Sequence, residues 1–334
     1  MLLSLTEKLR AGLDLDVVDV AEACEALFEE EAPLEAKAGF LRALRLKGEK
    51  ASEVAHFVKV LLEKGVTPDL GSGLLDVCGT GGDNAGLFNV STAVMFVAAA
   101  CGARVVKHGN RGVTSKSGGA DVLEALGVNV HAEPARALEA AGCCFLFAPN
   151  YHPGFKAVGE VRKAIAAEGS STVFNMLGPL LNPARPDFQL AGVYSESLLP
   201  VYAEAFRLLG RKRAWAAHGA GGLDEMSILG PTQIFAMEGE AIRSFEVRGE
   251  DLGVPLAQLE DLRGGSAQEN AALLEDLLAG KVSGPKRDIV ALNAAGALVV
   301  AGVAESLKAG LERALGALES GAGVEVLGRM RGVA

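Results

Sequence analysis

The sequence predicts an α/β protein in which a small N-terminal helical domain precedes a larger α/β domain with a mostly parallel central sheet. Residues 1–68 repeat apolar side chains at helical spacing. From about residue 73, short apolar runs alternate with helical patterns, which is typical of parallel strands joined by helices. The stretch 149–186 contains five prolines, which suits a hinge between the two parts. We therefore expect domains at 1–68 and 69–334, with the hinge and one helix contributed by about 150–186.

The expected helices and strands follow one another in the order that this fold requires. Helical patterns cover 16–30, 32–48 and 52–65 in the first domain. The second domain begins with strand patterns at 74–78, 104–107, 143–148, 190–194, 213–217 and 232–236, and a hairpin strand near 239–247. A buried helix opens at Asn89 or Ser91, and a helix at about 154–167 lies in the hinge. Leucine-rich helices at 267–279, 286–302 and 305–320 close the chain.

The composition narrows the classes of function that the chain can have. Of 334 residues, 49% are hydrophobic, only 5% are aromatic and 42 are glycine, which suits a sheet protein with many tight turns. The net charge of −10 argues against nucleic acid or an anionic membrane as the main partner. Five cysteines without a C-x-x-C pair indicate free thiols in a reducing compartment. We expect a cytoplasmic protein without a signal peptide or a transmembrane segment.

A glycine-rich turn and a basic loop form the most informative stretch of the chain. The first strand breaks into the sequence GTGGD at 79–83, and the buried helix follows. Residues 84–120 contain no acid, but they include Arg104, Lys107, Arg111 and Lys116. Glycines permit close backbone approach, and a helix N-terminus attracts anions through its unpaired N–H groups and its dipole. The stretch therefore predicts a pocket for phosphates.

Other interpretations of these residues remain open. The pattern matches neither G-x-G-x-x-G opening a helix nor G-x-x-x-x-G-K-[ST], and the glycines alone could serve a tight strand-to-helix connection. Lys116 is either a phosphate ligand or a solvated loop charge. Asp224 and Glu225 are adjacent acids in a glycine-flanked loop, which is more often solvated surface than a metal site. Arg162 on its own is more often an exposed helix arginine than a substrate ligand.

Several motifs together resemble the anthranilate phosphoribosyltransferases, a family with a nucleoside phosphorylase-like fold. They are GTGGD, FNVST, KHGNRGVTSKSGGADVLEALG, FAPNYHPG, VFNMLGPLLNP, GGLDEMS and LRGGSAQENA, and they span nearly the whole chain in the family's order. The resemblance implies transfer of the 5-phosphoribosyl group from phosphoribosyl pyrophosphate (PRPP) to the amine of anthranilate in tryptophan biosynthesis. It also implies Mg²⁺, with two ions when PRPP is bound, and a homodimer formed through the helical domain.

The resemblance also assigns roles to individual residues. For PRPP it implies Gly79, Gly82, Asp83, Asn89, Val90, Ser91, Thr92, Lys107, His108, Gly109, Asn110, Arg111, Gly112, Val113, Thr114, Ser115 and Gly119. For anthranilate it implies Gly79, His108, Asn110 and Arg162. For the metal it implies Ser91, Asp224 and Glu225. No acid–base triad is expected, since an aromatic amine is unprotonated at neutral pH. Charge stabilisation by Lys107 and the metal should suffice.

The chain departs from the family pattern at a few positions, and these keep alternatives open. Leu87 and Gly119 stand where the family usually has hydroxyls, and Leu181 replaces a usual Thr. The segment 163–173 is about three residues longer than the common pattern. Three alternatives remain: a PRPP transferase with another aromatic acceptor, an α/β protein that binds another sugar phosphate, and a non-catalytic relative that binds nucleic acid. A pyrimidine nucleoside phosphorylase is a further one, although its K-H-S-T-G-G-x-G-D motif is missing.

Overall fold

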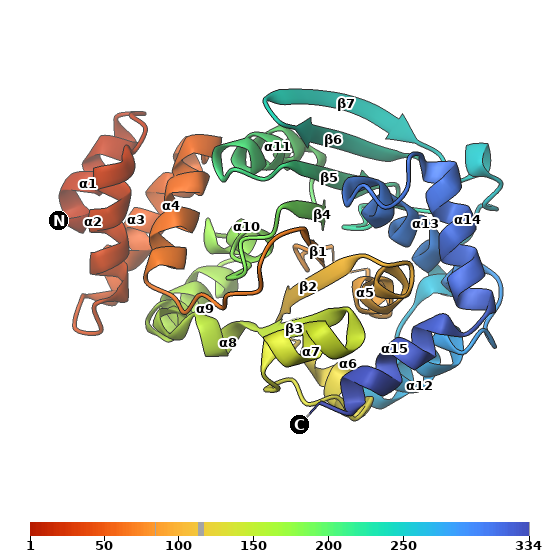
Figure 1. Ribbon diagram of the computed structural model, residues 1–334. Coiled ribbons are helices and arrows are strands. Elements are labelled where there is room, and N and C mark those ends of the chain that lie inside the picture. The colour runs from red at the N-terminus through yellow and green to blue at the C-terminus, as the bar shows by residue number, and fades with distance from the viewer. Residues whose placement is uncertain (84, 113–116, 334) are drawn as a thin grey trace.

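The computed structural model describes residues 1–83, 85–112 and 117–333. A helical unit lies at one side of the molecule, and a sheet flanked by helices occupies the rest (Figure 1). The helical unit contains α1 (Leu2–Arg10), α2 (Val17–Phe28), α3 (Leu34–Lys47) and α4 (Ala51–Glu63). Within the described residues, no helix combines the length and apolar character that a membrane span requires.

The central sheet has seven strands among the described residues, in the order β3-β2-β1-β4-β5-β6-β7. The strands are β1 (Leu74–Gly79), β2 (Arg104–Gly109), β3 (Cys143–Phe147), β4 (Phe188–Gly192), β5 (Arg213–Gly219), β6 (Thr232–Glu238) and β7 (Ala241–Val247). The first five are parallel, and β6 and β7 are antiparallel to their neighbours. The predicted α/β class, with a helical N-terminal part and a mostly parallel sheet, is confirmed.

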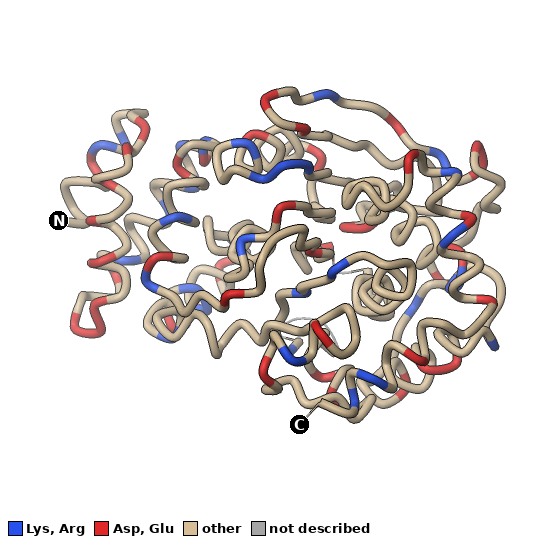
Figure 2. Tube along the Cα trace, viewed as in Figure 1, with Lys and Arg blue, Asp and Glu red and all other residues tan. Residues whose placement is uncertain are grey.

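Helices cover both faces of the sheet (Figure 1). One face packs against α5 (Val90–Ala100) and α13 (Pro285–Val300), with further helices around them. These are α6 (Gly119–Ala125), α7 (Pro134–Ala141), α12 (Ala267–Leu278), α14 (Leu307–Glu319) and α15 (Ala322–Arg331). The other face packs against α11 (Leu199–Leu208), which in turn contacts α4 of the helical unit. Charged residues lie mainly in the surrounding helices and loops, and the strands of the sheet are mostly uncharged (Figure 2).

The segment between β3 and β4 connects the helical unit to the sheet. It contains α8 (Ala148–Tyr151), η1 (Pro153–Val158), α9 (Gly159–Ala167), α10 (Phe174–Leu177) and η2 (Gly178–Leu180). Three buried side chains fix it to the sheet side of the molecule. Tyr202 OH donates to the Met176 carbonyl at 2.5 Å, Asn182 Nδ2 donates to the Val106 carbonyl at 2.7 Å, and Gln189 Nε2 donates to the Pro179 carbonyl. Hydrophobic residues of this segment, of the helical unit and of the sheet form one core. The domain limits and the hinge stay predictions.

The structure differs from the sequence expectations in the bounds of several elements. The strands β2 and β5 continue to Gly109 and Gly219, so Lys107 lies within a strand and not in the loop after it. The strand β4 begins at Phe188 and ends at Gly192, two positions before the expected limits. The last helix, α15, was not expected, because its glycines weaken the apolar pattern. Its buried Val326, Leu327 and Met330 join the main core, so tertiary packing forms this helix.

The remaining short elements are single helical turns near the ends of strands and helices. They are η3 (Glu196–Leu198), η4 (Glu250–Leu252) and η5 (Leu259–Leu262). The last of these leads into α12, which opens with Ser266 as its N-cap. The hydroxyl of Ser266 accepts from the Glu269 N–H, and the Glu269 carboxylate accepts from the Ser266 N–H. This capping box fixes the position at which α12 begins.

Candidate active site

The glycine-rich turn after β1 holds the carboxylate of Asp224, which lies in the loop between β5 and β6. The Asp224 Oδ2 atom accepts from the Gly81 N–H at 2.6 Å and from the Thr80 hydroxyl at 3.1 Å. Thr80 Oγ1 in turn accepts from the Tyr194 N–H at 3.1 Å, just beyond the end of β4. The carboxyl ends of three neighbouring strands therefore meet around one acid, as expected for a ligand site in an open parallel sheet.

Two glycines permit this close approach. A Cβ atom at Gly79 would lie 2.7 Å from Asp224 Oδ2, and a Cβ atom at Gly192 would overlap the Asp224 carbonyl. Gly81 has φ +70°, which lets the turn present its N–H to the carboxylate. Gly79 and Gly81 belong to the glycine-rich turn, whose glycines we expected to face a ligand. The structure shows that Gly79 and Gly81 also hold the acidic loop.

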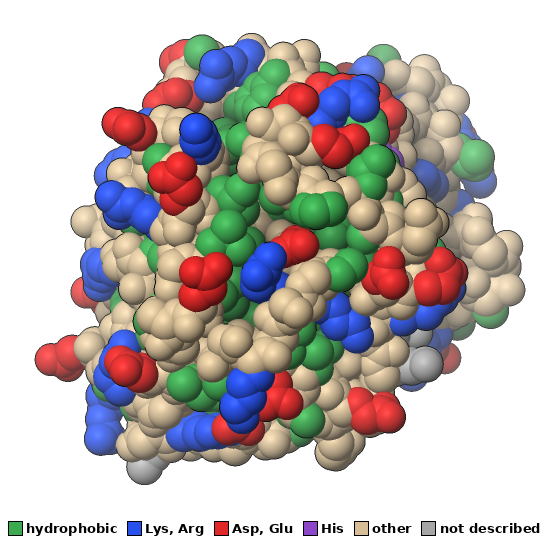
Figure 3. Space-filling model, turned by 90° about the vertical axis from the view of Figure 1, so that its right-hand side faces the viewer, with side chains coloured by type: hydrophobic (Ala, Val, Ile, Leu, Met, Phe, Trp, Pro, Cys, Tyr) green, Lys and Arg blue, Asp and Glu red, His purple; other side chains and the backbone are tan. Residues whose placement is uncertain are grey.

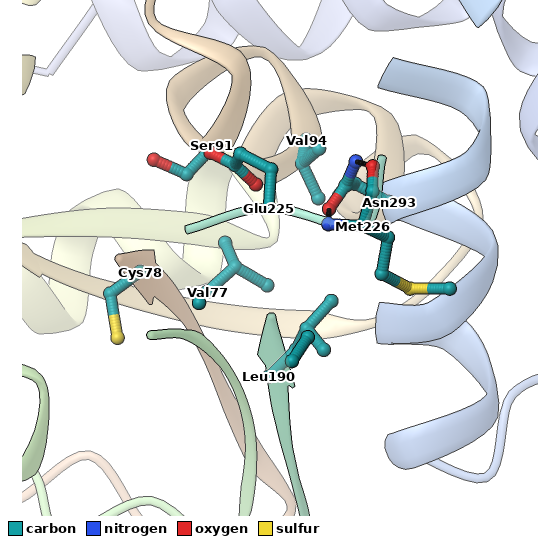
Figure 4. Close-up of a pocket in the computed structure, with 10 residues that line it drawn as sticks. Val77, Cys78, Ser91, Val94, Leu190, Glu225, Met226 and Asn293 are labelled. Carbon is teal, nitrogen blue, oxygen red and sulfur yellow. Dashed lines mark hydrogen bonds between the residues drawn. The ribbon is translucent and has the colours of Figure 1, made fainter. Parts of the chain in front are cut away.

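Lys107 projects from β2 toward the start of α5 and is buried. Its ammonium donates to the Val77 carbonyl at 2.7 Å and to the Ser91 hydroxyl at 3.0 Å. The backbone N–H of Ser91 donates to the carboxylate of Glu225. Figure 4 shows Ser91, from α5, and Glu225, from the loop between β5 and β6, beside each other at one small pocket. Lys107, Ser91, Asp224 and Glu225 thus belong to a single site.

The acids in this site lack enough positive charge to balance them. Burial, together with the charge of Asp83, raises the pKa of the Asp224 carboxyl to about 7. Burial also raises the pKa of Glu225 well above its usual range, and Asp224 adds to this while Lys107 opposes it. Carboxylate and hydroxyl oxygens are the donors that Mg²⁺ prefers. The oxygen atoms of Ser91, Asp224 and Glu225 therefore fit a divalent cation.

The protein does not surround such a cation by itself. Among the described residues, no three His, Cys, Asp or Glu side chains converge as they would in a fully protein-ligated site. Mg²⁺ commonly keeps several waters and binds one or two carboxylates together with substrate phosphates. Two adjacent acids and one hydroxyl match this kind of site better than a closed structural one.

The described residues on either side of the basic loop lie against α6. Asp121 Oδ2 accepts from the N–H groups of Gly112 and Gly118, both at 2.8 Å. The exposed guanidinium of Arg111 pairs with Glu124 at 2.5 Å and with Asp121 at 3.4 Å. Arg111 is therefore paired with two acids of α6. The expected PRPP contacts Val113, Thr114 and Ser115 lie outside the described residues, as does Lys116.

The other expected PRPP residues line the glycine-rich turn, the start of α5 and the start of α6. Asn89 immediately precedes α5, Val90 and Thr92 are buried in its first turn, and Asp83 Oδ1 accepts from the Ala85 N–H at 3.1 Å. Gly82 lies beside Tyr194, and Gly109 ends β2 against Phe145. Gly119 opens α6, and a Cβ atom there would lie 3.4 Å from Thr92 Oγ1. The structure brings these segments together at one edge of the sheet.

The first residue expected to bind the acceptor, His108, lies on the face of β2 opposite to Lys107. The buried His108 follows Lys107 in the strand, and its ring meets that of His152 edge to face at 5.3 Å. Burial and the neighbouring His152 lower the pKa of His108 to about 3, so its ring is neutral. Asn110 lies exposed two residues further on, and its Oδ1 accepts from the Arg111 N–H.

A run of aromatic rings connects His108 to Arg162. The His152 ring lies 5.7 Å from Phe155, and Phe155 lies 5.6 Å from Phe174. The guanidinium of Arg162 lies 5.7 Å from the centre of the Phe174 ring. It has no hydrogen bond or ion pair within the described part of the chain, and partial burial lowers its pKa. A pocket of about 370 Å³ between α2, α4 and η1 is lined in part by His152 and Phe155.

Comparison with known proteins gives a consistent result. A family model described as "Glycosyl transferase family, a/b domain" matches residues 71–324, and one described as "Glycosyl transferase family, helical bundle domain" matches 3–65. The anthranilate phosphoribosyltransferase of Rhodospirillum rubrum is 44% identical over 322 residues, which cover 96% of this chain and 92% of the relative.

The chain belongs to the anthranilate phosphoribosyltransferase family.

Solved structures of this family share the fold. The anthranilate phosphoribosyltransferase of Thermus thermophilus superimposes with a TM-score of 0.90 at 40% identity, covering 98% of both chains. The Saccharomyces cerevisiae enzyme, solved in complex with PRPP and Mg, gives 0.87 at 29% identity and covers 98% of this chain and 96% of its own. A further structure of the yeast enzyme holds 4-fluoroanthranilate and gives 0.87 at 28% identity, covering 99% of this chain and 96% of its own.

Several residues of this family site were not singled out from the sequence. Thr80 holds Asp224, and His152, Phe155 and Phe174 form the aromatic run. The signal was present, because Thr80 lies in GTGGD and the three rings lie in or beside FAPNYHPG and VFNMLGPLLNP. The contacts between these rings could not be predicted from the sequence, because they depend on how the segment between β3 and β4 folds back on the sheet.

Replacing Asp224 should stabilise the ligand-free protein in a pH-dependent way. A carboxyl whose folded pKa is raised costs stability above that pKa, and the cost falls as the pH drops toward its unfolded value of about 3.9. In EDTA, Asp224→Asn should raise the Tm by at least about 2 °C at pH 8, with a smaller gain at pH 5. Thermal denaturation followed by circular dichroism measures both. An equal Tm for the two proteins at pH 8 would contradict this account of the site.

Proposed function

We propose that this protein transfers the 5-phosphoribosyl group from PRPP to the amine of anthranilate, giving N-(5-phosphoribosyl)anthranilate and pyrophosphate. One observation carries the proposal. Lys107 and His108, adjacent on β2, point to the acidic metal-type site and to the aromatic run that ends at Arg162, respectively. A phosphorylated donor and an aromatic acid can thus meet at the end of this strand. The ligands seen in the yeast enzyme, PRPP with Mg and 4-fluoroanthranilate, support the same pair of substrates.

On the donor side, we assign the diphosphate to the glycine-rich turn, the start of α5 and the basic loop. Ser91, Asp224 and Glu225 would hold Mg²⁺, and we propose two ions when PRPP is bound. The metal would neutralise the pyrophosphate and so make it a better leaving group. Lys107 lies beside Ser91 and Glu225 and adds a fixed positive charge to the same wall.

On the acceptor side, we assign the carboxylate of anthranilate to Arg162. A guanidinium forms two parallel hydrogen bonds with a carboxylate, and this one lacks a carboxylate partner among the described residues. The rings of His108, His152 and Phe155 supply an apolar wall for the benzene ring. Asn110 and the backbone at Gly79 lie at the ends of β2 and β1, where the amine would meet the donor.

Catalysis in this proposal rests on alignment and charge. An aromatic amine already carries a free lone pair at neutral pH, so the protein need not remove a proton before attack. The C–O bond between the ribose anomeric carbon and pyrophosphate breaks as the C–N bond forms, and the amine then loses one proton to solvent. Holding both reactants in line contributes a large part of the rate enhancement.

The departures from the family pattern change none of the side chains that we assign to the acceptor. Leu87 pairs through its backbone with Arg263, and Leu181 is buried with its carbonyl bonded to His152 Nε2 at 2.8 Å. The longer segment extends α9 to Ala167, and Glu168 then pairs with Arg42 of α3 at 2.6 Å. At Glu168, this segment therefore contacts the helical unit. We keep anthranilate as the acceptor for this reason.

The test of the function is a direct assay with purified protein, PRPP, Mg²⁺ and anthranilate. The fluorescence of anthranilate should fall with time, and EDTA should abolish the change. Turnover of another aryl amine without turnover of anthranilate would keep the transferase and remove this acceptor. Phosphate-dependent cleavage of a pyrimidine nucleoside would instead support the nucleoside phosphorylase alternative.

Arg162→Ala should raise the KM for anthranilate about 10- to 100-fold, because a hydrogen-bonded charge pair contributes about 1.5–3 kcal/mol. The KM for PRPP should change little. Arg243→Ala is a matched control, since Arg243 also lies over an aromatic ring, Phe245, but on the edge strand β7. Steady-state kinetics with each substrate varied in turn measure these effects. An unchanged anthranilate KM in Arg162→Ala would remove the assigned role.

We also propose a cytoplasmic homodimer formed through the helical unit. Large apolar side chains are exposed there, at Leu3, Leu13, Val17, Val18 and Leu46. The five cysteines are free thiols, as expected in a reducing compartment. The face seen in Figure 3 carries acidic and basic side chains with hydrophobic ones between them.

Light scattering after size exclusion should give twice the chain mass. Leu46→Glu should weaken the dimer, whereas Leu256→Glu, at an exposed position outside the helical unit, should not. A monomer for the unmodified protein would contradict the proposal. Cell fractionation that recovered the protein in a membrane or secreted fraction would contradict the cytoplasmic assignment.

A further inference from the structure

One motif found in the sequence has no part in the function described above. It is LRGGSAQENA, which covers the end of η5 and the first turn of α12. We infer that two buried asparagines on the C-terminal helices position the two walls of the site: Asn270 of α12 the phosphate-binding segments, and Asn293 of α13 the acidic loop. The inference rests on the proposed function for what those walls bind.

Asn270 ties together three segments that are far apart in the sequence. Its Nδ2 donates to Asn89 Oδ1 at 3.0 Å and to Ser117 Oγ at 2.9 Å. Its Oδ1 accepts from the Gly265 N–H at 2.8 Å. Asn89 Nδ2 also donates to the Ser117 carbonyl at 3.3 Å. Asn270 as a whole residue is only 2% exposed, so water does not readily replace these bonds.

Residues just before α12 also hold the residues just before α5. The Phe88 N–H donates to the Leu262 carbonyl at 3.2 Å, and the Gly264 N–H donates to the Gly86 carbonyl at 2.9 Å. A Cβ atom at Gly264 would lie 2.7 Å from the backbone of Phe88, so a glycine is needed there. This short antiparallel pairing places α12 where Asn270 can reach Asn89. The start of α5 and the end of the basic loop are therefore held from outside the site.

Asn293 holds the acidic loop in a similar way. Its Oδ1 accepts from the Met226 N–H at 2.8 Å, and its Nδ2 donates to the Met226 carbonyl at 2.8 Å. Its Nδ2 also donates to the Ile289 carbonyl, one turn earlier in α13, at 2.9 Å. Figure 4 shows the Asn293 amide facing Met226, directly after Glu225 in the chain. Both backbone groups of Met226 are thus fixed by one side chain, and this sets where Glu225 can lie.

The two asparagines should have separable effects, because each one contacts a different wall. Losing Asn270 loosens Asn89 and Ser117, so binding of the donor phosphates must now order them. Losing Asn293 leaves those residues in place but loosens the loop that carries Asp224 and Glu225. Neither amide contacts the acceptor residues in the described structure, so the KM for anthranilate should stay nearly constant in both variants.

The experiment compares Asn270→Ala, Asn293→Ala and Asn182→Ala with the unmodified protein. Asn182 is also buried and also bonds a backbone carbonyl, but it lies on the connecting segment, which makes it a control for the loss of any buried amide. PRPP binding at saturating Mg²⁺ and the Mg²⁺ requirement at saturating PRPP are each measured by calorimetry and by initial rates. Calorimetry with PRPP gives a result even if anthranilate is not turned over, so this inference and the proposed acceptor can fail separately.

We expect Asn270→Ala to weaken PRPP binding about tenfold and to change the Mg²⁺ requirement less than about threefold, since a lost buried hydrogen bond costs about 1.4 kcal/mol. Asn293→Ala should raise the Mg²⁺ requirement about tenfold and weaken PRPP binding less than about threefold. Asn182→Ala should change PRPP binding and the Mg²⁺ requirement by less than about twofold each. Equal losses of both quantities in all three variants, or a lower Tm with unchanged binding, would overturn the inference. Should an alanine variant fail to fold, the serine substitution replaces it.

A second measurement tests the route through Ser117. If Asn270 acts by holding Ser117, the effects of Asn270→Ala and Ser117→Ala on PRPP binding should not add in the double variant. The double variant should then bind PRPP with about the same affinity as the single variant that binds PRPP less tightly. Fully additive effects would overturn this link between α12 and the basic loop.

Discussion

The site depends on one interaction, the capture of the Asp224 carboxylate by the glycine-rich turn after β1. Residues 143 positions apart are joined there by the bond from the Gly81 N–H, and the Thr80 hydroxyl adds a second bond to the same oxygen. Side chains larger than hydrogen at Gly79 or Gly192 would force the acid out of this place. The turn that opens the donor site and the loop that carries the acids therefore form one unit. Neither could be altered without moving the other.

The alternation of side chains along β2 separates the two halves of the site. Successive residues of a strand point to opposite faces of a sheet. Lys107 consequently points toward α5 and Ser91, while His108 points toward His152 and the segment between β3 and β4. Donor and acceptor groups approach from different faces, and they can meet only beyond the end of the strand. A register change of one residue would exchange the two side chains and abolish both halves.

The site destabilises the folded protein because it buries two adjacent acids. Asp224 and Glu225 are adjacent acids whose pKa values are raised by burial, and Lys107 offsets only part of their mutual repulsion. A divalent cation would remove that repulsion, which is why the arrangement favours metal binding over stability of the ligand-free chain. Helices α12 and α13 hold the loops from behind with the amides of Asn270 and Asn293.

The sequence by itself determined the helical N-terminal part, the order of the strands along the chain, the glycine-rich turn and the family, because local spacing and short motifs encode these features. It also predicted site roles for Asp224, Glu225 and Arg162 through the family motifs, and for Lys107 through the acid-free basic stretch as well. Only the tertiary structure decided the partners of these residues. That Gly81 bonds Asp224, that Lys107 is turned inward to Ser91, and that aromatic rings lead from His108 to Arg162 are long-range pairings. Such pairings depend on how distant segments pack, and no local pattern encodes them.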